Sequence, residues 1–298
     1  MIVNKQRIVQ EAGESWVQSN MTNKEWIALC ITSTGRIIAG SMGDGIRYSD
    51  DNGVNWTQSS KTDEIWESLC ITPTGRIIAG NANNKGIWYS DNNGVNWAQS
   101  NKTDGYWYDL CVTSTGRIIT GSYENGIWYS DDNGVNWTQS NITDRSWYAL
   151  CVTSTGRIIA SNANNNGIWY SDDNGVNWTQ SNETSDSWRS LCIMSTGKII
   201  AGNANNKGIW YSDDNGVNWA QSNKINGSLY ALCVTPIGRI ITGGYGQGSY
   251  NITSGIGIWY SDTITETQVS YTSKPLTGAQ ARELVQQCKA YVQGLKNS

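Results

Sequence analysis

The side chains in this sequence that are best suited to binding chemistry are aromatic rings, which recur beside amides and carboxylates. The chain holds 16 Trp and 15 Tyr, but no Phe and no His. Flat rings next to amide groups suit sugars and other polar ligands, because the ring offers an apolar face and an amide both donates and accepts hydrogen bonds. The candidate ligand-binding residues are Trp26, Trp66, Trp107, Tyr108, Trp147, Tyr148, Trp188, Asn81, Asn83, Asn162, Asn164, Asn203 and Tyr245.

The composition excludes several kinds of catalysis. Without His there is no Ser-His-Asp or Cys-His mechanism and no His-based zinc site. Hydrolysis by paired carboxylates needs two acids about 5–10 Å apart. The acids that could in principle meet this need precede the aromatic segments: Asp63, Glu64, Asp104, Asp144 and Asp186. Asp50-Asp51-Asn52-Gly53 lacks the alternating spacing of a calcium loop. We expect no metal, no cofactor and no enzymatic activity.

Charge and cysteine placement restrict the partners and the compartment. The net charge is −4 with no basic run, so a nucleic-acid partner is not expected. No segment approaches the length of a membrane span, and the first residues do not read as a signal peptide. Buried thiols rather than disulfides are expected at six equivalent positions, which favours a reducing compartment, with a surface or virion adhesin as the alternative. These cysteines are Cys30, Cys70, Cys111, Cys151, Cys192 and Cys233.

An eight-residue segment recurs along the chain and sets the positions of all these residues. SDDNGVNW, once written SDNNGVNW, begins at Ser49, Ser90, Ser130, Ser171 and Ser212, so the intervals are 41, 40, 41 and 41 residues. Each unit contains four short β-type segments separated by Gly- and Asn-rich turns. In residues 147–182 these segments read WYALCVT, RIIA, GIWYS and VNWTQS. Four strands in about 40 residues is the size of one β-propeller blade.

The number of copies predicts the number of blades. The first segment occurs six times, but the fourth segment follows a complete unit only five times. The sixth copy of the fourth segment lies at the N-terminus, where IVQEAGESWVQSN aligns with the repeat. We therefore predict an all-β fold, a six-bladed β-propeller of four-stranded blades over residues 1–273. Pairing of the N- and C-terminal strands closes the ring and removes an exposed sheet edge.

The repeated segment is expected to be a structural hairpin turn between the third and fourth strands. Its Gly suits a positive φ, the Asp directly after the Ser is expected to accept turn N–H groups, and the Trp covers the turn and fills the gap between blades. Arg36, Arg76, Arg117, Arg157 and Arg239, with Lys198 in the remaining copy, are expected to pair with these Asp residues. The structural residues are Ser49, Asp50, Gly53, Trp56, Asp91, Gly94, Trp97, Asp131, Gly134, Trp137, Asp172, Gly175, Trp178, Asp213, Gly216 and Trp219.

The pattern Ser-x-Asp-x-Gly-x-x-Trp resembles the Asp-box, or bacterial neuraminidase repeat. Over about residues 7–262 the chain is similar to the sialidase-like Asp-box β-propellers. The resemblance implies the fold but no single activity, because sialidases, glucan-cleaving hydrolases, sorting-receptor domains and photosystem assembly factors share the box. A sialidase would need an arginine triad and a Tyr–Glu pair. Five arginines are copies of one repeat position, so a triad is not evident, and no Glu lies where a unique Tyr makes an obvious pair.

The units differ mainly in the connections that emerge opposite the boxes. Loops on a rigid framework commonly carry function, and the insertion at residues 245–255 is the strongest asymmetry. We expect a non-catalytic, multivalent binding propeller that recognises glycans or similar polar surface ligands on this face. The alternatives are a protein–protein scaffold or assembly factor and a divergent sialidase-like glycoside hydrolase. The aromatic residues that open the first segments have a competing role as core between blades.

The C-terminal residues 274–298 form a separate unit in this prediction. Thr277 and Gln280 fit a capping box, and apolar residues then recur at helical spacing. The sequence predicts an amphipathic helix over 277–294. This helix either packs on the propeller or docks a partner or a second copy.

Overall fold

The structure is a computed structural model that describes residues 19–21, 25–162, 164–222, 228–235, 238–245 and 257–261. These residues form 23 strands and no helix. The predicted N-terminal strand, its pairing with the last sheet, most of the insertion at 245–255 and the helix at 277–294 lie outside the described residues.

Five sheets have four antiparallel strands and the sixth has three, each made of consecutive strands. The first three sheets contain β1 (Trp26–Ile31), β2 (Ile37–Ser41), β3 (Ile46–Ser49) and β4 (Thr57–Gln58); β5 (Trp66–Ile71), β6 (Ile77–Asn81), β7 (Ile87–Ser90) and β8 (Ala98–Gln99); and β9 (Trp107–Val112), β10 (Ile118–Ser122), β11 (Ile127–Ser130) and β12 (Thr138–Gln139). The others contain β13 (Trp147–Val152), β14 (Ile158–Asn162), β15 (Ile168–Ser171) and β16 (Thr179–Gln180); β17 (Trp188–Ile193), β18 (Ile199–Asn203), β19 (Ile209–Ser212) and β20 (Ala220–Gln221); and β21 (Ser228–Val234), β22 (Ile240–Tyr245) and β23 (Gly257–Tyr260).

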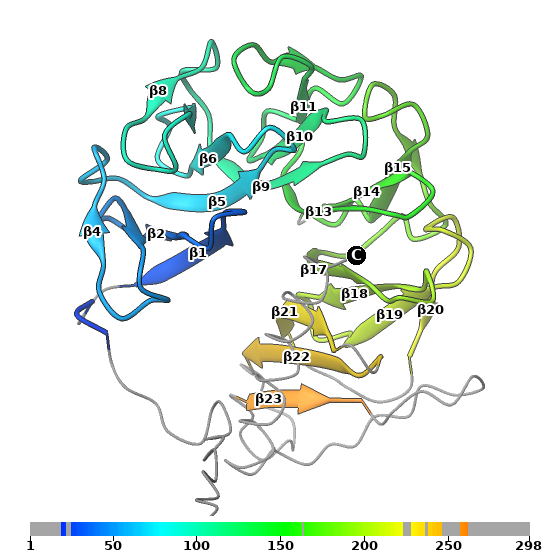
Figure 1. The fold of residues 1–298 in the computed structure, drawn as a ribbon. Coiled ribbons are helices and arrows are strands. Elements are labelled where there is room, and N and C mark those ends of the chain that lie inside the picture. Colours follow the sequence, from blue (N-terminus) through cyan, green and yellow to red (C-terminus); the bar gives the residue numbers. More distant parts are fainter. Residues whose placement is uncertain are drawn as a thin grey trace, which may run out of the picture.

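The sheets follow one another around a common axis, as a β-propeller requires (Figure 1). The first strand of each sheet lies nearest the axis and contacts the first strand of the next sheet, from β1 to β21. The short fourth strands lie at the rim. Since the units share one sequence pattern, the same register recurs from sheet to sheet, including a bulge at the start of the first strand.

The hydrophobic core lies between sheets. In one such layer, Ile38 and Ile46 of the first sheet pack against Trp66, Ile77 and Trp97 of the second. The Trp that opens the first strand is fully buried in four sheets, so these rings pack in the core between blades and have no exposed face for a ligand. They are Trp66, Trp107, Trp147 and Trp188.

The repeated box is the turn between the third and fourth strands, as predicted. In the third sheet Ser130 Oγ accepts the Gly134 N–H at 2.9 Å, and Gly134 has a φ of 87°. Trp137 Nε1 donates to Gly134 O at 3.1 Å, so the indole folds over its own turn. Asp132 Oδ1, the second residue after the Ser, accepts the Asn136 N–H at 2.8 Å.

The predicted role of the Asp directly after the Ser is therefore wrong, whereas its predicted pairing with the repeated cation is confirmed. Asp131 accepts two bonds from Arg117, at 2.6 Å from Nε and 2.8 Å from Nη2. Arg117 Nη1 also donates to Asn174 O of the next sheet at 3.1 Å. The first Asp of the box thus holds an arginine that links neighbouring sheets, and Asp50, Asp91 and Asp172 hold their arginines in the same way. In the fifth sheet Asp213 pairs with Lys198 instead, at 3.0 Å.

Candidate functional site

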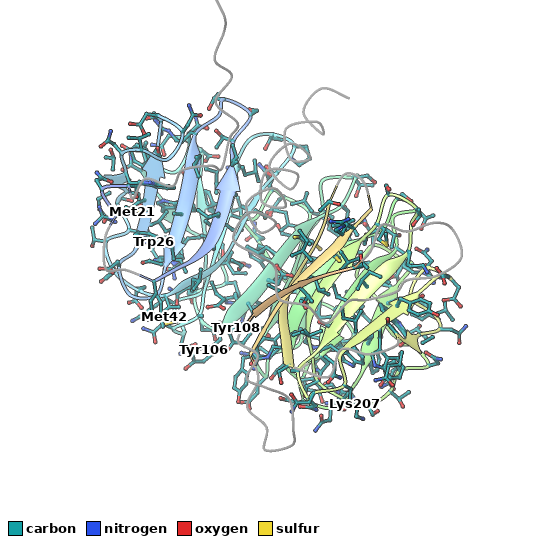
Figure 2. The ribbon with its side chains drawn as sticks, turned by 90° about the horizontal axis from the view of Figure 1, so that it is seen from below. Met21, Trp26, Met42, Tyr106, Tyr108 and Lys207 are labelled. Carbon is teal, nitrogen blue, oxygen red and sulfur yellow. The ribbon has the colours of Figure 1, made fainter. Side chains whose placement is uncertain are left out.

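One end of every sheet carries the boxes, and the other end carries the connections that vary between units. This follows from the strand order, because in an antiparallel sheet alternate turns emerge at opposite ends. In Figure 2, Met42, Tyr106, Tyr108 and Lys207 lie toward the same lower edge of the molecule. We call this end the loop face; it is formed by residues 42–45, 59–65, 82–86, 100–106, 123–126, 140–146, 164–167, 181–187 and 204–208.

The predicted Asn residues divide into two groups on this face. Those that end the second strand are fully buried, and their side-chain oxygens accept backbone N–H groups of the following turn, so they shape the loops and cannot contact a ligand. They are Asn81, Asn162 and Asn203. Asn83 and Asn164 are exposed. Their amides donate to Glu64 Oε2 at 2.8 Å and to Ser146 Oγ at 3.0 Å.

Four different side chains meet near the axis at the second position of the first strand. Glu67, Tyr108, Tyr148 and Arg189 come from β5, β9, β13 and β17, and each is half-buried. The Tyr108 and Tyr148 rings stack with centroids 4.5 Å apart and planes at 11°. The Arg189 guanidinium lies 4.1 Å from the centre of the Tyr148 ring. We call these four residues the axial cluster.

Tyr106 and Tyr123 extend the axial cluster toward the loop face. Tyr123 meets Tyr108 edge-on with ring centroids 6.3 Å apart, and it meets Tyr106 edge-on at 6.2 Å. Tyr106 is 38% exposed. The aromatic surface therefore runs from the half-buried axis to solvent.

The electrostatics of the axial cluster keep the Tyr108 phenol protonated. Burial raises the pKa of Tyr108 above its ordinary value, and the nearby Tyr148 and the charge of Glu67 raise it further. Burial also raises the pKa of Glu67, although Arg189 opposes this effect. Glu67 therefore lies near Tyr108, whereas no such Tyr–Glu pair was expected from the sequence. At neutral pH the Tyr108 hydroxyl is a hydrogen-bond donor and not a phenolate.

The acids that could have formed a hydrolytic pair have local cations instead. Lys102 Nζ lies 2.7 Å from Asp104, and Lys207 Nζ lies 2.6 Å from Asp186. Glu64 and Asp144 form longer ion pairs with Lys85 at 3.9 Å and with Arg145 at 3.7 Å. Four of the five acids named from the sequence therefore each lie beside a cation, and among the described residues Asp63 forms no such ion pair.

Of the predicted aromatic ligand residues whose side chains the structure describes, Tyr108 and Tyr148 stack on each other near the axis. Trp26 is half-buried and stacks on Trp56, with ring centroids 6.5 Å apart. Tyr245 ends β22, and its side chain lies outside the described residues. Glu67 and Arg189 were not among the predicted ligand residues. Both occupy the second position of the first strand, which is the position in that strand where the units differ most, so a comparison of the units at this position would have found them.

Other chemistry is limited in the described part of the chain. No three metal-ligating side chains gather there, and none of its residues form a helix that could cross a membrane. The thiols of five first strands, Cys30, Cys70, Cys111, Cys151 and Cys192, are not in disulfides, as predicted. Burial raises the pKa of Cys30 to about 12, so this thiol is not reactive at neutral pH.

No protein-family model matches the chain, and no curated protein matches its sequence. Solved structures define its class, because β-propellers match it along most of its length. The virginiamycin B lyase from Staphylococcus aureus matches with a TM-score of 0.66 and 11% identity, over 89% of this chain and 89% of the lyase.

Two further matches have other roles. An ancestral GH74 enzyme matches with a TM-score of 0.67 and 17% identity, over 89% of this chain and 44% of that enzyme. YCF48 bound to D1 peptide matches with a TM-score of 0.63 and 14% identity, over 86% of this chain and 82% of YCF48. At these identities the likeness establishes the β-propeller fold and nothing about activity.

Proposed function

We propose that the chain is a non-catalytic binding propeller of the Asp-box kind, which takes a glycan or a similar polar ligand at the axial cluster. The observation that carries this proposal is the contrast between framework and site. Box and core repeat from sheet to sheet, whereas the axial position holds Glu67, Tyr108, Tyr148 and Arg189 in four successive sheets. Varied polar and aromatic groups on a rigid framework are typical of ligand sites.

The chemistry of the axial cluster suits a polar ligand with an apolar face. The protonated Tyr108 phenol donates a hydrogen bond, while Glu67 and Arg189 add an acceptor and a donor of opposite charge. Tyr106 and Tyr123 supply ring surface toward solvent. Since the repeated Trp and Asn residues are buried, the arrangement favours one asymmetric site over the set of equal sites expected from the sequence.

Two alternative functions remain as proposals. A protein–protein scaffold is favoured by the exposure of Met42 (48%) and Tyr106 (38%) on the loop face, because Met and Tyr are enriched at protein interfaces; YCF48, a structural neighbour, is bound to a peptide. A glycoside hydrolase is less well supported, although GH74 enzymes share the fold. The raised pKa of Tyr108 opposes its use as a nucleophile.

A glycan array tests the proposal. We expect wild-type protein to bind a subset of glycans and Arg189→Gln to weaken that binding about tenfold or more, because a hydrogen bond to a charged group is worth roughly 1.5–3 kcal/mol. Lys85→Gln is the matched control, since Lys85 is a loop-face cation outside the axial cluster. An array without signal at high protein concentration, or an equal loss in both variants, contradicts the proposal. A peptide array run in parallel separates the scaffold alternative.

A further inference from the structure

One innermost strand carries an acid at a position where its sister strands have Ala or Ser. The third residue of the first strand is Ala28, Ser68, Asp109, Ala149 and Ser190 in the first five sheets. Asp109 follows Tyr108 of the axial cluster directly. Its two carboxylate oxygens accept backbone N–H groups, and no cation within the described ranges is bonded to them. A carboxylate placed in this way needs an explanation, because its burial costs free energy.

Asp109 joins two sheets at the level of the axial cluster. Its Oδ1 accepts the Leu110 N–H of its own strand at 2.9 Å, and its Oδ2 accepts the Leu150 N–H of β13 at 2.7 Å. Ser68 and Ser190 make only weaker bonds to the next sheet, because their hydroxyls donate to carbonyl oxygens at 3.4 Å. Bonds to an ionised acceptor are shorter and about twice as strong as neutral ones.

This bond lies beside the stacked rings. Tyr108 precedes Asp109 on β9, and Tyr148 lies two residues before Leu150 on β13. A link between residues 109 and 150 therefore fixes the distance between the strands where the rings meet, with centroids 4.5 Å apart. We propose that Asp109 is a positioning residue that holds Tyr108 and Tyr148 in their stacked geometry and so shapes the binding surface. The effect on binding rests on the proposed function, whereas the effect on the rings does not.

The protonation of Asp109 makes this link depend on pH. Burial raises the pKa of Asp109 to about 7, although the bonds from Leu150 and Leu110 lower it. The groups whose charge interacts with Asp109 are the thiols of Cys70, Cys111 and Cys151. Burial raises the pKa of all three, so they stay neutral near pH 7 and supply no charge. Below this range the protonated carboxyl is a weaker acceptor, and the link to β13 loosens.

Nuclear magnetic resonance of ring-¹³C-labelled tyrosine tests the positioning. The two resonances are assigned with Tyr108→Phe and Tyr148→Phe. When the pH is varied, we expect both tyrosine resonances of the wild-type protein to shift together with a midpoint near pH 7, because the pKa of Asp109 is about 7. Asp109→Asn removes the titrating group while keeping the shape, so the shifts lose this dependence. Asp109→Ser introduces the residue found at this position in two sister strands and should also remove the pH dependence. It serves as the test if Asp109→Asn does not fold.

Ser190→Ala is the matched control and retains the wild-type titration. A titration that persists in both Asp109 variants, or rings that do not respond to pH or to either substitution, overturns the inference. The glycan array at pH 6 and pH 8 adds a second readout. Wild-type signal should fall several-fold at the lower pH, and Asp109→Asn should not show this fall. A blank array with an intact ring titration overturns the proposed function and supports the positioning role.

Discussion

In the third sheet, Asp131 and Asp132 are neighbours in sequence but have different partners. Asp131 receives Arg117, whereas Asp132 accepts the Asn136 N–H and the Asn136 side-chain amide, the latter at 2.6 Å. The second sheet replaces the second Asp by Asn92, whose Oδ1 accepts the Asn96 N–H at 2.8 Å. At the scale of the residue, the turn therefore needs an acceptor at this position but does not need a charge.

This division predicts different results for two substitutions at Asp132. Asp132→Asn should cost less than about 0.5 kcal/mol, because it keeps the acceptor used in the second sheet and loses only the charge, whereas Asp132→Ala should cost about 1 kcal/mol because the turn amide loses its acceptor. Urea unfolding at pH 7 measures both. An equal cost for Asn and Ala contradicts the assignment.

The pH dependence at the same residue has a definite sign. Burial raises the pKa of Asp132, but the bonds from Asn136 and Ser130 outweigh it and hold the pKa below the ordinary value of 3.8. A carboxyl whose folded pKa is lowered stabilises the fold above its unfolded pKa and loses this effect as the pH falls. Asp132→Asn should therefore lose less stability than wild type on acidification below about pH 4.

The residues of the candidate site were predicted only in part, and burial explains why. Tyr108 and Tyr148 were singled out as aromatic residues that open a strand. Trp107 was singled out for the same reason, yet it is fully buried because the neighbouring sheet covers it. Side chains alternate along a strand, so adjacent aromatics face different surroundings. The sequence pattern does not predict which of two adjacent aromatic residues faces the next sheet.

At the scale of the element, the first three strands of each unit were predictable and the fourth was not. WYALCVT, RIIA and GIWYS correspond closely to β13, β14 and β15, because apolar runs between Gly-rich turns are strong strand signals. VNWTQS was predicted as a six-residue strand, but β16 is only Thr179–Gln180. The box turn uses the preceding amides: Asn177 N donates to Asp173, and Trp178 N donates to Asn141 of the previous connection.

The junction between sheets depends on an arginine that Lys cannot replace fully. Arg117 holds Asp131 with two nitrogens and reaches Asn174 O of the next sheet with the third. Lysine has one ammonium group and cannot span both partners. Arg117→Lys should therefore lower the free energy of unfolding by about 1 kcal/mol, measured with urea. Arg76→Lys should cost the same, because Arg76 repeats both contacts; a cost at only one site contradicts this account.

At the scale of the whole molecule, the exposed apolar residues mark two complementary faces. Wherever two described sheets pack, the Cys of one first strand faces the next sheet; Cys70, for example, packs in a cluster with Leu110. Leu29, the counterpart of Leu110 on the first sheet, is 66% exposed. Cys233, the counterpart of Cys70 on the last sheet, is also exposed. The face that is buried at other junctions is thus exposed on the first sheet.

A hydrogen bond of Asn20, just before the first sheet, indicates which sheet packs against the first sheet. Asn20 Oδ1 accepts the Trp56 N–H at 3.0 Å, as Asn101 Oδ1 accepts the Trp137 N–H at 2.9 Å. Asn101 follows β8, the fourth strand of the preceding sheet, within two residues. By the same pattern we predict a fourth strand before Asn20, in the sheet that precedes the first. The last sheet has three strands within the described part of the chain, so we predict that it precedes the first and closes the ring.

Substitution of Leu29 tests ring closure. In a closed ring Leu29→Asp buries an unpaired carboxylate against the last sheet, and we expect the free energy of unfolding to fall by about 3 kcal/mol or more. Val54→Asp is the matched control, because Val54 is 61% exposed on a box turn that no sheet covers, and it should change stability by less than about 0.5 kcal/mol. Equal effects of the two substitutions would show that the first sheet is open in solution. Light scattering on the wild type then separates closure within one chain from packing against a second copy. A ring closed within one chain remains a monomer. Packing of the first sheet against the last sheet of another copy repeats without closing and forms open polymers.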